Sequence, residues 1–207
     1  MLMRAVGHFN DKGQKINLTY KDCYILEKSD RIDNAVKIGQ PLEETCEKCG
    51  GKIFDILTID GNDERLKFLG IDGKIKARVC PDCVMMSQAS FCKYTVNGES
   101  EILHNEEGSD ESYTTEEDIE KFKNNGYVLS KKKVNPFFGC DEDTFSTIGG
   151  MAFWVQDPTF LTCPVCGKPM KYFAQLHWSR FVENAEGTLF FEICQDCNII
   201  GMLHQQT

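Results

Sequence analysis

Residues 45–50 read TCEKCG and residues 162–167 read TCPVCG, and each stretch precedes a further cysteine pair, CPDC at 80–83 and CQDC at 194–197. The similarity extends upstream, where Pro41 and Pro158 stand at the same distance before the first pair of each copy. Apolar residues also alternate before the second pair of each copy, at 75, 77 and 79 and at 189, 191 and 193. The sequence therefore contains an internal duplication centred on C-x-x-C pairs.

Two C-x-x-C pairs at the ends of antiparallel strands offer four sulfurs to one tetrahedral ion, which is the ligand set of structural zinc sites. We expect two structural Zn2+ ions. Four thiolates leave no open coordination position for a substrate, so a catalytic zinc is not expected. An alternative that the sequence leaves open is an exchange of cysteine pairs between the copies. The expected ligands are Cys46, Cys49, Cys80 and Cys83 for one ion and Cys163, Cys166, Cys194 and Cys197 for the other.

Two other uses of these cysteines are disfavoured. A redox-active dithiol is expected to open a helix after a strand in a βαβ unit, and none of the four pairs is predicted to have that context. Iron–sulfur ligation would use the same soft sulfur donors. The remaining cysteines, Cys23, Cys92 and Cys140, are interpreted as ordinary buried or half-buried thiols.

The hydrophobic pattern predicts a strand-dominated α+β fold, in which a β unit containing a zinc ribbon is duplicated in tandem and helices are few and short. Strands are predicted at 52–60 and 74–79 in the first copy. In the second copy, alternate residues from Met170 to Trp178 are expected to share one face of a strand. Further hairpins are predicted at 6–9 with 14–20 and at 91–96 with 99–103.

An acidic linker at 105–113 is followed by a predicted helix that Thr114 or Thr115 can cap and that extends to residue 124. Its apolar pair, Ile119 and Phe122, predicts only light packing on the surface. We divide the chain here into an N-terminal half, 1–112, and a C-terminal half with the linker helix, 113–207. The two halves are expected to form one compact unit.

Composition narrows the function classes. The chain has 23 Lys and Arg against 32 Asp and Glu, a net charge of -9, which argues against nucleic acid as a partner. No run of about 18 apolar residues predicts a membrane span, and no signal-peptide core is evident, so a cytoplasmic protein is expected. No nucleophile–base pair or phosphate-binding glycine loop indicates an enzyme.

Residues 147–175, TIGGMAFWVQDPTFLTCPVCGKPMKYFAQ, together with the ending GMLHQQT at 201–207, resemble the bacterial YwqG-like family of unknown function. The order of these parts is also similar to that of the eukaryotic programmed cell death 2 proteins, which act as chaperones for a ribosomal protein. The resemblance implies a duplicated, mainly β architecture with an intimate interface between the copies. It also implies a partner-binding role for Gly149, Gly150, Trp154, Gln156 and Gln175, and Pro158 is a further residue that matches the family's motif.

The resulting hypothesis is that the chain is a zinc-stabilised cytosolic protein-binding module. A chaperone of a basic, ribosomal client protein is the specific form of this hypothesis. Its negative charge has the sign that a Lys- and Arg-rich partner requires. Two alternatives remain open: an immunity-type protein that neutralises a toxin, and an enzyme whose site lies in a cleft between the repeats.

Overall fold

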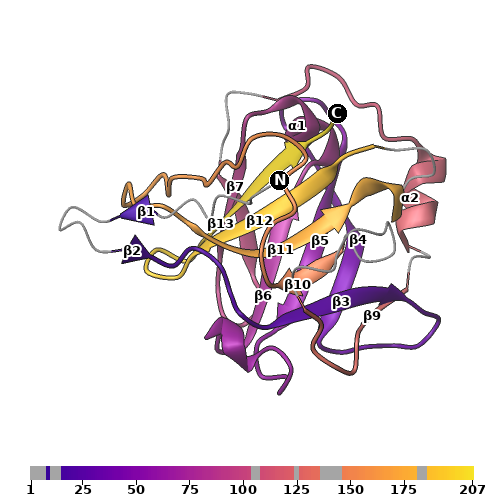
Figure 1. Ribbon diagram of the computed structural model, residues 1–207. Helices are drawn as coiled ribbons and strands as arrows, with labels where there is room; N and C mark the ends of the chain where they lie inside the picture. The colour runs from indigo at the N-terminus through magenta and orange to yellow at the C-terminus, as the bar shows by residue number, and fades with distance from the viewer. Residues whose placement is uncertain (1–7, 10–14, 104–107, 124–125, 136–145, 181–185) are drawn as a thin grey trace.

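The computed structural model describes residues 8–9, 15–103, 108–123, 126–135, 146–180 and 186–207. Its strands form three antiparallel sheets, of two, eight and three strands (Figure 1). The fold is thus dominated by strands, as the sequence predicts. No helix in the described residues is both long and apolar enough to traverse a lipid bilayer.

The largest sheet combines strands from both sequence halves. Its order is β8-β7-β13-β12-β11-β10-β3-β9. Strands β10 to β13, from the C-terminal half, form its centre. Strands from the N-terminal half lie on both sides of that centre, with β7 and β8 on one side and β3 on the other, and β9 pairs with β3 at the edge. The members are β3 (Cys23–Lys28), β7 (Ser90–Tyr94), β8 (Ser100–Leu103), β9 (Tyr127–Leu129), β10 (Thr147–Gly149), β11 (Lys171–His177), β12 (Thr188–Cys194) and β13 (Ile199–Gln205).

The three-stranded sheet belongs to the first copy and has the order β4-β5-β6. Its strands are β4 (Val36–Thr45), β5 (Lys52–Asp60) and β6 (Lys74–Val79), and the last two have the bounds that the sequence predicts. A short ribbon of β1 (His8–Phe9) and β2 (Lys15–Ile16) confirms pairing in the predicted N-terminal hairpin, whose turn lies outside the described residues. Single 3-10 turns follow at η1 (Lys67–Leu69) and η3 (Trp178–Arg180).

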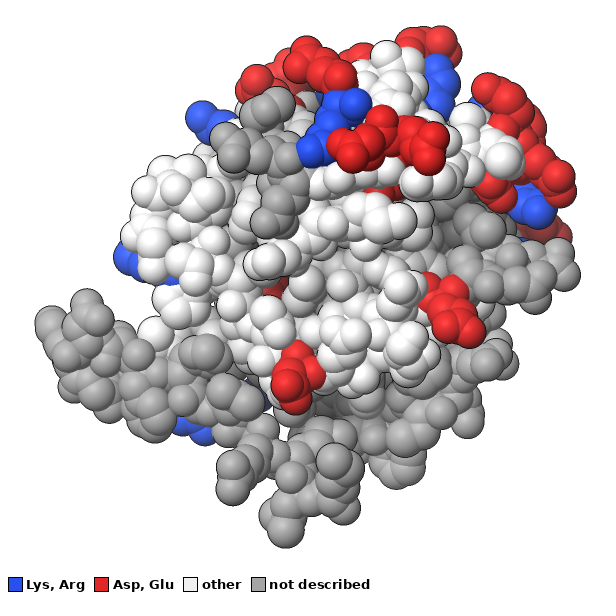
Figure 2. All heavy atoms as spheres, turned by 90° about the horizontal axis from the view of Figure 1, so that it is seen from above, with Lys and Arg blue, Asp and Glu red and all other residues white. Residues whose placement is uncertain are grey.

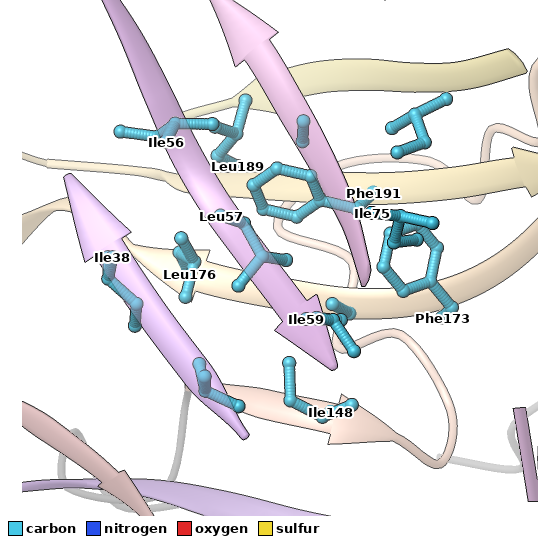
Figure 3. Packing of buried hydrophobic residues seen from close by; sticks show 14 of the residues in the cluster. Ile38, Ile56, Leu57, Ile59, Ile75, Ile148, Phe173, Leu176, Leu189 and Phe191 are labelled. Carbon is cyan, nitrogen blue, oxygen red and sulfur yellow. The ribbon is translucent and has the colours of Figure 1, made fainter. Parts of the chain in front are cut away.

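The main hydrophobic core lies between these two larger sheets. Figure 3 shows Ile38 and Leu57 of the three-stranded sheet facing Leu176 and Phe191 of the eight-stranded sheet, and all four side chains belong to one buried cluster. Burial of this apolar surface is the main favourable term in folding. β5 and β12 are buried along nearly their whole length, which explains their almost continuous apolar sequences.

A second, smaller cluster lies on the other side of β11–β13. It contains Leu161, Met170, Ile199 and Leu203, with Trp154 packed against it. The register shifts in β11 between Tyr172 and Ala174. This irregularity corrects the prediction that alternate residues from Met170 to Trp178 share one face, because Met170 lies in the smaller cluster and Trp178 in the main core.

Helix α2 (Glu116–Lys123) corrects a second prediction, because its apolar pair is buried rather than lightly packed. Ile119 is 4% and Phe122 1% exposed. The Phe122 ring lies 4.9 Å from that of Phe54 and 6.2 Å from that of Trp178, measured between centroids. Two apolar side chains are enough because they insert into the core at the edge of β4. The cap is Thr115, whose Oγ1 accepts the Asp118 N–H while the Asp118 carboxylate accepts the Thr115 N–H.

Replacing the buried aromatic ring of α2 tests this packing. Phe122→Ala is expected to lower the free energy of unfolding by about 3–5 kcal/mol, because the cavity lies between two aromatic neighbours and cannot fill. Chemical denaturation measures the change. Glu117→Ala, on the exposed side of the same helix, is the control and is expected to change stability by less than about 0.5 kcal/mol. Equal effects of the two substitutions would contradict burial of the helix.

Candidate metal centres

The eight repeated cysteines form two groups, and each group consists of the pairs that are neighbours in sequence. Within each group all four sulfurs lie within 4.8 Å of one another. The first pair of copy one is the turn between β4 and β5, and its second pair begins directly after β6. In copy two, the first pair precedes β11 and the second joins β12 to β13. The pairs are therefore not exchanged between the copies.

The sulfur spacing suits a four-coordinate metal. The Sγ atoms of Cys46 and Cys83 are 3.6 Å apart, those of Cys49 and Cys80 3.4 Å, and those of Cys166 and Cys194 3.7 Å. A tetrahedral ion with metal–sulfur bonds of about 2.3 Å places its ligands about 3.8 Å apart. A disulfide needs about 2.05 Å between the sulfurs. Both groups could thus hold a metal ion.

We call the turn formed by the first C-x-x-C pair of each copy its leading knuckle and the turn formed by the second pair its trailing knuckle. The two leading knuckles have the same backbone geometry. Gly50 N–H donates to Cys46 C=O at 2.8 Å, and Gly167 N–H donates to Cys163 C=O at 2.9 Å. Both glycines are left-handed, with φ of 74° and 70°. Glycine adopts this conformation without strain, which explains why it follows the cysteine pair in both copies. In the second copy's trailing knuckle Asn198 takes the same role, with φ of 56°.

The Cys80–Cys83 pair differs from the other three. It opens helix α1 (Pro81–Met86) directly after β6, with Cys80 as the N-cap and Pro81 in the first turn. Here Val84 follows the second cysteine, and a β-branched residue disfavours the left-handed turn. This pair therefore does open a helix after a strand, which is one part of the context expected of a redox-active dithiol. β6 pairs antiparallel with β5, however, and both sulfurs lie beside those of Cys46 and Cys49.

The electrostatics of the groups call for a cation. Burial and neighbouring thiols raise the pKa of Cys83 to about 12, and burial likewise raises the pKa of Cys194 to about 12. The exposed Cys166 has its pKa lowered to about 7, chiefly because the Lys168 backbone N–H donates to its sulfur. Without a metal the sulfurs of one group cannot all ionise, and a bound divalent ion removes that barrier by neutralising their charge.

The acid inside each trailing knuckle has a different environment. Asp82 is 1% exposed and accepts hydrogen bonds from Ser112 Oγ at 2.8 Å and from Thr114 N and Oγ1 at 3.1 and 2.7 Å. It thereby fastens the linker over the first group. Its counterpart Asp196 has a 69% exposed side chain and pairs with Lys168. No cysteine of the first group is fully exposed, since Cys80 is buried and the other three are half-buried, whereas Cys166 of the second group is exposed.

Of the residues to which the resemblance assigns partner binding, Trp154 packs against the smaller hydrophobic cluster. Gly149, Gly150 and Gln175 are buried, and Gln175 Oε1 accepts the Phe153 N–H at 2.9 Å. The Trp154 ring lies 4.6 Å from that of Phe190. Gln156 is exposed and donates from its N–H to Gln205 Oε1 at 3.1 Å. These contacts hold residues 150–163, which include Pro158, against the large sheet; their role toward a partner stays a prediction.

Sequence reasoning missed Glu192, an acidic residue within the apolar run of β12. Its side chain is fully buried, and Oε2 accepts the Leu161 N–H at 2.8 Å, while Oε1 has no hydrogen-bond partner among the described residues. Burial raises the pKa of this carboxyl to about 8. The signal was a single Glu at an alternating position of a strand whose other residues are apolar. Cys23 and Cys92 are buried, as interpreted, and Cys140 lies outside the described residues.

Fold and site together define a strand-dominated protein with two four-cysteine groups, one in each copy of the duplication, that could hold metal ions. The chain is 26% identical over 211 residues to a distant relative, the uncharacterized protein YpfL of Salmonella typhimurium. That match covers 99% of this chain and 49% of YpfL, so the chain spans about half the length of its curated relative. No protein-family model and no solved structure matches, and membership of the YwqG-like family is not confirmed.

Unequal cover of the two groups predicts two rates of metal release. With excess chelator, the metal-loaded protein is expected to lose the exposed second site first and the covered first site later, followed with a metal-sensitive dye. Asp82→Ala is expected to speed the slow phase by about tenfold or more, since it frees the linker. The matched Asp196→Ala is expected to leave the slow phase unchanged. If Asp82→Ala leaves the rate of the slow phase unchanged, the linker does not protect the first group.

The buried Glu192 predicts a pH dependence. Its pKa is raised on folding, so the folded state holds a proton that the unfolded state releases, and this contribution to stability is lost as pH rises toward and through about 8. Glu192→Gln is expected to remove that loss, so its stability relative to the native chain improves by up to about 1.4 kcal/mol per pH unit.

Urea denaturation between pH 6 and pH 9 measures this difference. Glu27→Gln, at an exposed position of β3, is the control and is expected to follow the native chain at every pH. A constant difference between Glu192→Gln and the native chain would show that Glu192 does not titrate on unfolding.

Proposed function

We propose that both four-cysteine groups bind Zn2+ and that the ions are structural. The support is the ligand set, because four sulfurs at tetrahedral spacing suit zinc and leave no coordination position for a substrate. Thiolate ligands must be reduced before they bind metal, so we place the protein in a reducing compartment such as the cytoplasm.

We further propose that the protein is a binding module for a positively charged protein partner. The observation that carries this proposal is the charge: each Zn(Cys)4 unit adds about -2, which takes the chain from -9 to roughly -13. Figure 2 shows Asp and Glu side chains gathered along one margin of the face seen from above, with Lys and Arg side chains interspersed among them. Such a field attracts a Lys- and Arg-rich partner and speeds its encounter.

The acidic side chains have identifiable places in the fold. The first turn of α2 contributes Glu116, Glu117 and Asp118, and the turn that carries Cys46 contributes the exposed Glu44 and Glu47. Both regions flank the covered first cysteine group. A chaperone for a ribosomal protein, the role that the resemblance implies, is one instance of this function.

Capture from the cells that make the protein tests the proposal. The tagged chain is recovered at low salt, eluted with rising salt, and its companions are identified by mass spectrometry. We expect one basic protein, in nearly stoichiometric amount, to elute at moderate salt, because its contacts with the chain are largely electrostatic. A variant with Glu116, Glu117 and Glu120 changed to Gln is expected to retain less of it. Recovery of no basic protein, or retention that is indifferent to salt, would contradict the proposal.

A further inference from the structure

A pocket of about 620 Å³ lies beside the first cysteine group. One wall is the first knuckle with its approach, residues 44–48, and another is the end of β6 with Cys80. The third is β8 (Ser100–Leu103), all of whose residues line the pocket. We call this pocket the β8 groove. Its walls come entirely from the N-terminal half, so it is not a cleft between the two copies.

All four β8 residues line the groove, so it reaches the edge of this strand, and Ser90 of the neighbouring β7 shows that it also extends over one face of the sheet. Successive side chains of a strand point to opposite faces, so a pocket against one face would be lined by alternate residues. β8 is the last strand of the large sheet, and among the described residues its only strand neighbour is β7. An edge strand presents unpaired backbone groups to whatever lies beside it.

The hairpin register shows which backbone groups these are. Thr95 N–H donates to Glu99 C=O at 2.9 Å, which makes these two residues a hydrogen-bonded pair. Pairs alternate along an antiparallel ladder, so Lys93 with Glu101 and Phe91 with Leu103 are also hydrogen-bonded. The N–H and C=O groups of Ser100 and Ile102 therefore point away from β7, toward the open edge.

The walls of the groove indicate the chemistry of its occupant. Ile53, Val79, Ile102 and Leu103 supply apolar surface, and Glu44, Glu47 and Glu101 stand exposed around it. Cys46, Cys80 and Cys83 also line it, and a divalent ion held by the four thiolates would give this wall a charge of about -2. Arg78 and Lys48 add positive charge, but Arg78 donates to Asp55 at 2.9 Å and lies 3.6 Å from Glu44. The groove is thus anionic with apolar patches.

We propose that the β8 groove binds an extended, positively charged segment of a partner protein, which adds to β8 as a further strand. Backbone hydrogen bonds to Ser100 and Ile102 would fix the segment, and alternate side chains would meet the apolar surface and the carboxylates. This inference deepens the proposed function and rests on it, since it assigns to the positively charged partner a place and a conformation.

Fluorescence anisotropy with a labelled peptide of alternating lysine and valine tests the groove on the full, metal-loaded chain. Ile102→Pro removes an outward N–H without breaking a bond to β7, and it is expected to weaken binding by about tenfold or more. Ile102→Val keeps the N–H and a β-branched side chain, and is expected to bind as the native chain does. Equal affinity of the proline and valine variants would overturn the proposal.

Charge reversal gives a second comparison that does not depend on proline. Glu47→Lys and Glu101→Lys are each expected to weaken the lysine–valine peptide several-fold, whereas Glu27→Lys, on β3 near the opposite end of the large sheet, makes the same charge change and is expected to have little effect. A peptide of alternating glutamate and valine is expected not to bind. Equal losses for all three variants would mean general charge attraction and overturn the groove.

Hydrogen exchange on the native chain locates the contact and separates the two proposals. Peptide binding is expected to slow exchange of the Ser100 and Ile102 amides. If the peptide binds without protecting them, the groove is wrong while binding of a basic partner stands. If the peptide does not bind at all, the groove is overturned, and the capture experiment alone then decides the proposed function.

Discussion

Four cysteine sulfurs that all lie within 4.8 Å of one another can all ionise only when a cation balances their charge, and this constraint applies to both groups. Cys49 and Cys80 stand 3.4 Å apart although a whole hairpin separates them in sequence. A metal ion bound at this point would tie the β4–β5 turn to the end of β6. The second group ties the approach to β11 to the turn between β12 and β13. Apparent binding free energies of structural zinc, about 10–16 kcal/mol in small domains, are comparable to the whole stability of a domain.

The two halves of the duplication have diverged around this shared constraint. In the first copy the trailing knuckle opens a helix, and its aspartate is buried under the linker. In the second copy the trailing knuckle turns into β13, and its aspartate stays exposed. The residue after the last cysteine, Val84 in one copy and Asn198 in the other, accounts for the difference in backbone path. The halves nevertheless share one large sheet, so each depends on the other for its core.

The sequence predicted the local features well because they depend on nearby residues. Cysteine spacing gave the two groups, and alternating apolar residues gave β5 and β6 with their bounds. Features that depend on distant contacts were missed. The burial of Phe122 requires the gap at the edge of β4, and the different surroundings of Met170 and Trp178 follow from a register irregularity within β11. Strand order in the large sheet is likewise a long-range property that no window of sequence contains.

Of the candidate site, the ligand set was predictable and its surroundings were not. The cover over the first group depends on Asp82 meeting Ser112 and Thr114 across the linker, and the β8 groove depends on an edge that becomes visible only in the folded sheet. X-ray absorption at the zinc edge, on protein purified under reducing conditions, tests the central claim most directly. We expect two zinc ions per chain, each with four sulfur neighbours at about 2.3 Å. Nitrogen or oxygen ligands, or a folded chain without zinc, would contradict it.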